Sequence, residues 1–128
     1  MPKSRGDRPP AKKPGESYCP EAGDVIWIDL DPTKGHEQRG RRPVLVLSPR
    51  RYNIRAELCV ACPITSQAKG YPFEVAIPEG GAVSGGAVLA DQMRSLSWAA
   101  RHAEFRAAAP AAMLAEVRAK IAALIEIE

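Results

Sequence analysis

The chain has 128 residues, of which 45% are hydrophobic and 26% charged, so it is long and apolar enough to fold as one domain around its own core. It has no apolar run that could cross a bilayer, and its basic, proline-rich start lacks the apolar stretch of a secretory signal, which favours a cytoplasmic protein and no contact with a membrane. The net charge is +3, yet residues 34–55 hold seven basic side chains against one acid, which indicates either an anionic partner such as nucleic acid or a solvated arginine-rich face.

The first 17 residues are rich in proline and charge. With four prolines and seven charged side chains, residues 1–17 cannot bury enough apolar surface to offset the entropy lost on ordering. A disordered basic tail is therefore predicted, and the folded domain is expected to span residues 18–128.

Six segments of the domain have the composition of β-strands. They are rich in β-branched and apolar residues and are bounded by glycine, proline or aspartate turns. Residues 86–96 fit either one long bent strand or two short ones. The predicted strands cover residues 23–30, 42–48, 58–65, 72–78, 86–96 and 101–107.

Residues 110–128 have helical periodicity. Pro110 suits the first turn of a helix, and apolar residues recur behind it at a spacing of three and four. Many short strands followed by one closing helix predict a mainly β fold, a small and strongly bent β-barrel with a C-terminal helix. The residues of the predicted apolar stripe are Leu114, Val117, Ile121, Leu124 and Ile125.

The cysteines and tryptophans are expected to be structural. Cys59 and Cys62 have the spacing of a zinc or redox site, but they lie in an apolar predicted strand, where residues three apart face opposite sides, and the chain offers no second ligand pair. Together with Cys19 they are predicted to be buried thiols. Trp27 and Trp98 are expected in the core or in a dimer interface, with base stacking as the alternative.

Three blocks of the sequence resemble the MazF/PemK (Kid) toxin family. They are GDVIWIDLDPTKGHEQRGRRPVLVLSP at 23–49, CPITSQAKGYPFEV at 62–75 and ADQMRSLSWAAR at 90–101. Together with the terminal helix they keep the family's order and spacing over residues 18–128. The resemblance implies an SH3-like barrel of the MazF/CcdB type, usually a homodimer.

The resemblance also implies a function. Members of this family are toxins of type II toxin–antitoxin systems that cut single-stranded RNA without a metal ion or other cofactor. A small cognate antitoxin neutralises them, and operator DNA is expected to be contacted only through the complex with that antitoxin.

The same resemblance assigns candidate site residues. Arg42 and Thr65 match the catalytic positions, and Glu37 matches an acidic residue near the active site. His36 and Arg41 fall at positions that vary in the family, and the Asp91-Gln92 block matches a segment linked to RNA contact or support of the site. The candidates for RNA binding are Lys34, His36, Gln38, Arg39, Arg41, Ser66, Lys69, Gln92 and Arg94.

The chemistry of these residue types fits metal-free RNA cleavage. The RNA 2′-hydroxyl can attack the adjacent phosphate if a base takes its proton, a cation stabilises the phosphorane and an acid protonates the leaving oxygen. The guanidinium of Arg42 suits two phosphate oxygens, and Thr65 can donate one hydrogen bond to the same group. Glu37 fits a base or a residue that orients an arginine; His36 fits an RNA contact or an incidental loop residue, and His102 a structural or solvated one.

Two other functions compete with this reading. A CcdB-like protein would share the barrel but poison DNA gyrase by binding it, and a degenerate nuclease would remain only as a DNA- or RNA-binding regulator. The pair of Arg42 and Thr65, together with the basic residues at 34–55, favours the nuclease.

Overall fold

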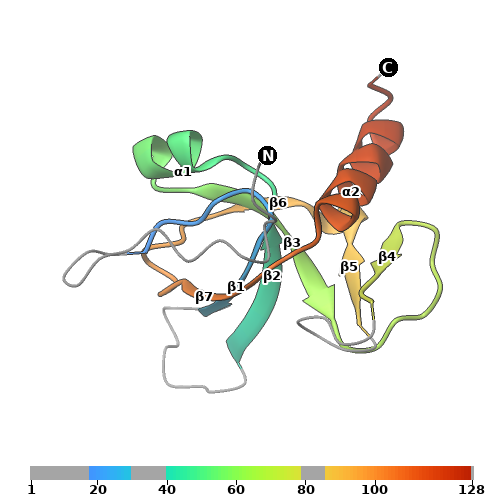
Figure 1. Ribbon diagram of the computed structural model, residues 1–128, viewed down its shortest axis with the longest axis horizontal. Helices are drawn as coiled ribbons and strands as arrows, with labels where there is room; N and C mark the ends of the chain where they lie inside the picture. Colours follow the sequence, from blue (N-terminus) through green and yellow to red (C-terminus); the bar gives the residue numbers. More distant parts are fainter. Residues whose placement is uncertain (1–17, 30–39, 79–85, 128) are drawn as a thin grey trace.

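The computed structural model describes residues 18–29, 40–78 and 86–127, so the predicted tail over residues 1–17 lies outside the described part of the chain. Within this part the chain forms a single antiparallel sheet with two α-helices and a 3₁₀ helix (Figure 1). In chain order the elements are β1 (Asp24–Asp29), β2 (Arg41–Val46), α1 (Arg50–Ala56), β3 (Cys59–Thr65), β4 (Glu74–Ala76), β5 (Ala87–Leu89), η3 (Ala90–Gln92), β6 (Arg94–Leu96), β7 (Glu104–Ala108) and α2 (Ala111–Leu124).

The sheet is bent but not closed. Its strands follow the order β4-β5-β3-β2-β1-β7, and β6 pairs with β3 beside β5. The mainly β class with a terminal helix is confirmed, whereas closure into a barrel is not found among the described residues. In that part of the chain β4 pairs only with β5 and β7 only with β1, so the outer strands do not meet. Residues 86–96 form the two short strands β5 and β6, separated by η3.

Alternation along the three central strands divides the interior into two apolar clusters. Successive strand side chains point to opposite faces, so neighbouring residues enter different clusters. Val25, Leu45 and Cys62 pack on the face covered by α2. Ile26 and Cys59 pack on the other face, together with Tyr18 and Trp98 among others. The central strands are therefore buried on both sides, which explains their nearly continuous apolar sequence.

Helix α2 covers one face of the sheet with a shorter stripe than expected. Pro110 precedes the helix as its N-cap residue rather than lying in its first turn. Leu114, Val117 and Ile121 are buried as predicted, but Leu124 and Ile125 are 44% and 54% exposed. The stripe loses contact with the sheet at the end of the helix, where Ile125 is already the C-cap residue.

Helix α1 was not predicted. It has seven residues, three of them arginines, and its apolar Tyr52 and Ile54 are exposed, so it carries no apolar stripe. It is held instead by fully buried Asn53, whose amide nitrogen donates to the carbonyls of Pro20 and Ser48, both at 2.9 Å. The Asn53 amide oxygen accepts a hydrogen bond from the Ser48 hydroxyl at 2.6 Å. Helix α1 is therefore held by buried hydrogen bonds of Asn53 and not by an apolar face of the kind that sequence patterns detect.

The structural roles of the cysteines and of Trp98 are confirmed. Cys19, Cys59 and Cys62 are all buried free thiols, and Cys59 and Cys62 lie in opposite clusters, as their spacing predicted. Burial raises the pKa of both Cys59 and Cys62 to about 12. Trp98 is buried and donates its indole N–H to the carbonyl of Asn53 at 3.0 Å.

Candidate active site

Arg42 lies in β2 at the point where this strand separates from β3. The pairing of the two strands begins with Val44 opposite Pro63. Arg42 precedes Val44 by two residues and Thr65 follows Pro63 by two, so the antiparallel register directs both side chains to the same face. Figure 1 shows the ends of β2 and β3 diverging on the side of the molecule away from both helices. The two predicted catalytic residues therefore lie at neighbouring, splayed strand ends.

The side chains of Arg42 and Thr65 are free to donate toward a ligand. Arg42 is exposed, and among the described residues its guanidinium donates one hydrogen bond, from Nη1 to the carbonyl of Arg41 at 3.3 Å. Thr65 is half-buried, and its Oγ1 accepts a hydrogen bond from the backbone N–H of Gln67 at 3.1 Å. This bond uses an oxygen lone pair and leaves the hydroxyl hydrogen available.

Thr65 also lines an open cavity of about 400 Å³. Predicted RNA contacts Lys69 and Gln92 line the same cavity, and so does Asp91 from the same 3₁₀ helix as Gln92. Apolar and aromatic side chains complete the wall, so the cavity combines flat apolar surface with a few hydrogen-bonding groups. The apolar lining residues are Tyr71, Pro72, Phe73 and Leu89.

Glu74 fixes the loop that carries Lys69. The Glu74 carboxylate accepts hydrogen bonds from the backbone N–H groups of Lys69, at 3.0 Å, and Gly70, at 2.8 Å. Gly70 has a φ of 81°, a left-handed conformation that strains any residue with a side chain. The backbone of the loop that carries Lys69 is thus held in place at the wall of the cavity.

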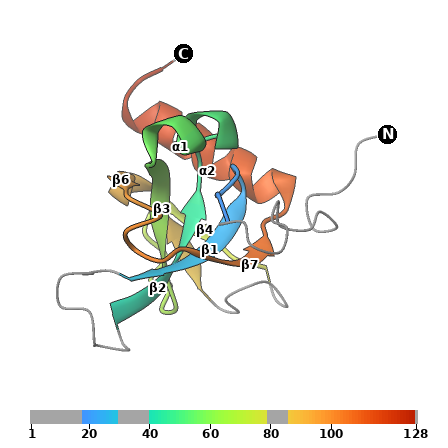
Figure 2. The ribbon, with the colours of Figure 1, turned by 90° about the vertical axis from the view of Figure 1, so that its left-hand side faces the viewer.

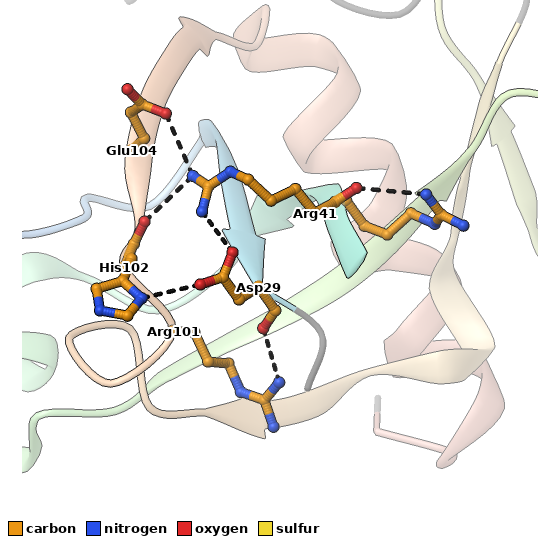
Figure 3. A network of polar contacts seen from close by, with 6 residues as sticks. Asp29, Arg41, Arg101, His102 and Glu104 are labelled. Atoms are coloured by element: carbon orange, nitrogen blue, oxygen red, sulfur yellow. Dashed lines mark hydrogen bonds and ion pairs between the residues drawn. The ribbon is translucent and has the colours of Figure 1, made fainter. Parts of the chain in front are cut away.

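A polar network lies at the other side of Arg42, at the ends of β1 and β2 (Figure 3). The Asp29 carboxylate contacts Arg41 Nη1 at 2.6 Å and His102 Nδ1 at 2.8 Å. Arg41 Nη2 donates to the His102 carbonyl and to Glu104, both at 3.2 Å. The hydrogen bond from His102 and the neighbouring Arg41 guanidinium hold the pKa of Asp29 below its usual value.

The backbone of Asp29 joins the same network. Its N–H donates to the carbonyl of Arg101 at 2.9 Å, and its carbonyl accepts a hydrogen bond from Arg101 Nη1 at 2.9 Å. The end of β1 is thereby tied through both backbone and side chain to residues 101–104, which precede and begin β7.

The structure brings some of the predicted site residues together and places others apart. Thr65, Lys69 and Gln92 line one cavity, and Arg42 lies at the neighbouring strand end. Ser66 and Arg94 are exposed and line none of this cavity. Residues 34, 36, 37, 38 and 39 lie outside the described residues, so the roles predicted for Lys34, His36, Glu37, Gln38 and Arg39 stay predictions.

The basic segment at 34–55 does not form one patch in the described part of the chain. Arg41 and Arg42 lie at the start of β2, whereas Arg50, Arg51 and Arg55 belong to α1. Figures 1 and 2 place α1 toward the same end of the molecule as α2 and away from the start of β2. Arg50 is also partly structural, since its Nε donates to the carbonyl of Cys19 at 3.1 Å.

Sequence reasoning missed Asp29, Arg101 and Glu104. The sequence does hold a signal for one of these contacts. Asp29 and Arg41 have opposite charges and lie opposite each other in the register of β1 and β2, which favours an ion pair between them. The contacts to residues 101–104 join segments more than 60 positions apart in the chain. No local pattern reveals such contacts.

The described residues were also compared with what a membrane span and a metal site require. Neither helix there has both the length and the apolar character that a membrane span requires. In the same residues no three side chains of histidine, cysteine, aspartate or glutamate are grouped so that they could hold a metal ion.

Comparison with known proteins identifies the family. Residues 21–125 match the family model of the PemK-like, MazF-like toxins of type II toxin–antitoxin systems. The chain is 47% identical over 108 residues to the endoribonuclease toxin MazF of Escherichia coli K12, covering 84% of this chain and 96% of the relative. It is 33% identical to the endoribonuclease PemK of Escherichia coli, covering 82% and 81%.

A solved structure agrees with the sequence matches. MazF in the crystal structure of the MazE–MazF complex (Form-II) from Deinococcus radiodurans is similar to this chain with a TM-score of 0.78 and 50% identity, covering 88% of this chain and all of the other. The resemblance inferred from the three sequence blocks is therefore confirmed. This chain belongs to the PemK-like, MazF-like toxins of type II toxin–antitoxin systems.

Proposed function

We propose that this chain is an endoribonuclease toxin that cuts single-stranded RNA in the cytoplasm without a metal ion, with Arg42 and Thr65 as catalytic residues. The observation that carries the proposal is the position of these two residues at the splayed ends of β2 and β3, where Thr65 also lines the cavity of about 400 Å³. Relatives of 47% and 33% identity that are named endoribonucleases support it.

In the proposed reaction the RNA supplies its own nucleophile. The 2′-oxygen attacks the adjacent phosphorus and loses its proton to a base, the bond to the 5′-oxygen breaks, and that oxygen takes up a proton. The products are a 2′,3′-cyclic phosphate, or the 3′-phosphate formed from it by hydrolysis, and a 5′-hydroxyl. The guanidinium of Arg42 stabilises the charge that develops on the phosphoryl oxygens, because a guanidinium is a cation that presents paired donors.

Thr65 contributes a hydrogen-bond donor. Its oxygen is held by the N–H of Gln67 at 3.1 Å, so its hydroxyl hydrogen can point to a phosphate oxygen between the two strand ends. Glu37 is the proposed general base on the basis of the family resemblance. Arginine is a poor base near neutral pH because its pKa exceeds about 12.

The cavity beside Thr65 is the proposed place for an RNA base. Single-stranded RNA is recognised through unstacked bases that pack on aromatic surface and use their hydrogen-bonding edges. Tyr71 and Phe73 supply such surface, the Asp91 carboxylate can accept from base amino groups, and Gln92 can both donate and accept. Lys69 at the rim suits a phosphate.

The proposed partners follow from the relatives. Structures of MazE–MazF complexes from Deinococcus radiodurans contain a toxin 50% identical to this chain. We therefore propose a homodimer that binds a cognate antitoxin, and contact with operator DNA only through that complex.

The deciding experiment is incubation of the purified protein with single-stranded RNA and with DNA of the same sequence, both in EDTA. We expect the RNA to be cut to 5′-hydroxyl and cyclic-phosphate or 3′-phosphate ends, and the DNA to stay intact because it lacks the 2′-hydroxyl. Cleavage that disappears in EDTA and returns with magnesium contradicts the proposal. An RNA that stays intact under all conditions favours a gyrase poison or a binding protein instead.

A further inference from the structure

We propose that Asp29 and His102 are positioning residues for the cleavage reaction, which fix Arg41 and through it the segment of β2 from which Arg42 projects. This inference rests on the proposed function, because it concerns the same site, but its structural part can be tested without RNA. It also gives Arg41 a positioning role in place of the RNA contact predicted from the sequence.

Asp29 is the centre of the network because its carboxylate is shared by two donors from different segments. Arg41 Nη1 approaches one oxygen at 2.6 Å and His102 Nδ1 the other at 2.8 Å. The Asp29 side chain is 22% exposed and that of Arg41 32%, so both are partly withdrawn from water. A carboxylate bound through both oxygens has little freedom to rotate, which makes it suited to holding an arginine in one orientation.

The second terminal nitrogen of Arg41, Nη2, also donates to protein acceptors. Nη2 donates to the His102 carbonyl and to Glu104, so Arg41 spans from β1 to the turn before β7 and to β7 itself (Figure 3). With both terminal nitrogens engaged by protein acceptors, Arg41 is poorly placed to hold a phosphate. Its contacts instead fix the first residue of β2.

The link from Arg41 to Arg42 runs through the backbone. Arg42 follows Arg41 directly in β2, and its Nη1 donates to the Arg41 carbonyl at 3.3 Å. The register places Asp29 opposite Arg41 and Ile28 opposite Arg42, so the network closes the hairpin immediately beside Arg42. A rigid support matters here, because a misplacement of about 1 Å can reduce a reaction rate by about 10²-fold.

His102 has a left-handed backbone conformation. Its φ is 55°, in the region that glycine favours and in which asparagine, aspartate and histidine are enriched among the other residues. Its ring is 73% exposed, so burial of the ring does not explain why histidine occupies this position. The contact of its Nδ1 with Asp29 is what the side chain adds.

Three substitutions test the role of the network, each measured as single-turnover cleavage of RNA at saturating protein and as RNA affinity by fluorescence anisotropy. Asp29→Asn replaces one of the two acceptor oxygens by an NH₂ group, so that one of the two donors loses its acceptor. His102→Gly removes the ring and relieves the backbone. His102→Asn tolerates the same φ and places an amide donor where the imidazole Nδ1 was. Glu116→Gln, on the exposed side of α2, is the control for loss of one negative charge.

We expect Asp29→Asn to lower the single-turnover rate about tenfold or more and His102→Gly about threefold or more, with little change in affinity. His102→Asn should return the rate to within about twofold of the unsubstituted protein, since it keeps the donor. Glu116→Gln should cut at the unsubstituted rate. If Asp29→Asn and His102→Gly cut at the unsubstituted rate, if their losses lie in affinity, or if His102→Asn is no better than His102→Gly, the proposal is wrong.

An NMR measurement separates this proposal from the proposed function. The Nε–H resonances of Arg41 and Arg42 report the setting of both guanidinium groups in the absence of RNA. We expect Asp29→Asn to shift both resonances, and an unchanged Arg42 resonance contradicts the positioning role. If the unsubstituted protein fails to cut RNA while Asp29→Asn shifts the Arg42 resonance, the proposed function is wrong and the network stands.

Discussion

Thr65 Oγ1 accepts a hydrogen bond from the backbone N–H of Gln67 at 3.1 Å, and this contact keeps the hydroxyl hydrogen from pointing toward Gln67. The N–H occupies one lone pair, so the O–H is left to donate away from the 66–67 turn. We therefore expect the hydroxyl, rather than the methyl group of threonine, to take part in the proposed reaction.

We expect Thr65→Val, which keeps the shape but loses the hydroxyl, to lower single-turnover RNA cleavage by about 10²-fold, the usual cost of one preorganised donor. Thr65→Ser should retain most of the activity. Rates at saturating protein measure both variants. If Thr65→Val and Thr65→Ser are equally active, the hydroxyl has no part in the reaction.

Arg42 should be sensitive to the shape of its cation as well as to its charge. We expect Arg42→Ala to lower the single-turnover rate by about 10²–10³-fold, and Arg42→Lys to recover little of it, because lysine lacks the paired donors of the guanidinium. Arg51→Ala is the matched control, since Arg51 is an exposed arginine on α1, at the other end of the molecule. Normal cleavage by Arg42→Ala at saturating protein would reduce Arg42 to a binding residue.

Strands β1 and β2 and the α2 helix could be predicted from the sequence, as could the bend of the sheet, whereas α1 and the open edges of the sheet could not. The apolar runs of β1 and β2 are visible in the sequence, but the division by which Val25 and Leu45 enter one apolar cluster and Ile26 and Val44 the other is seen only in the structure. Helix α1 depends on buried Asn53, a polar residue that no hydrophobic pattern marks. The open sheet depends on which strands pair at its edges, which local sequence does not determine.

For the candidate site, the sequence indicated residues but not their arrangement, and the roles of these residues stay predictions. Resemblance to a family gave Arg42 and Thr65, but only the pairing of β2 with β3 explains how they come to lie at neighbouring strand ends. The contact of Asp29 with His102 crosses 73 positions of the chain, so it required the fold itself.

Asn53 should contribute strongly to stability. Its amide makes three hydrogen bonds within a fully buried site, and its carbonyl accepts from Trp98. Asn53→Leu leaves the carbonyls of Pro20 and Ser48 without their amide donor and is expected to cost about 3 kcal/mol, because buried unpaired polar groups cost about 1–3 kcal/mol each. Urea denaturation followed by tryptophan fluorescence measures this loss. A change below about 1 kcal/mol would show that water replaces the amide.

The three thiols should be inert in the folded protein. All are buried, and burial raises the pKa of Cys59 and Cys62 to about 12, so almost no thiolate is present near neutral pH. We expect Ellman's reagent at pH 8 to react with none of the three in native protein and with all of them in guanidinium chloride. Rapid reaction of one thiol in the native state would reveal an opening of the core around it.

The stabilising effect of Asp29 should disappear in acid. Its folded-state pKa is lowered, first by the hydrogen bond from His102 and then by Arg41, so the native state favours the ionised carboxylate. A group with a depressed folded pKa stabilises the protein above its unfolded pKa, about 3.9 for aspartate, and loses that contribution as the pH falls through the folded pKa. We therefore expect the unsubstituted protein to have a higher melting temperature than Asp29→Asn at pH 5, and this difference to shrink steadily below about pH 4. Glu116→Gln provides the control for removing one carboxylate. A difference between the unsubstituted protein and Asp29→Asn that stays constant down to pH 2 would mean that the contacts to His102 and Arg41 do not depend on the charge of Asp29.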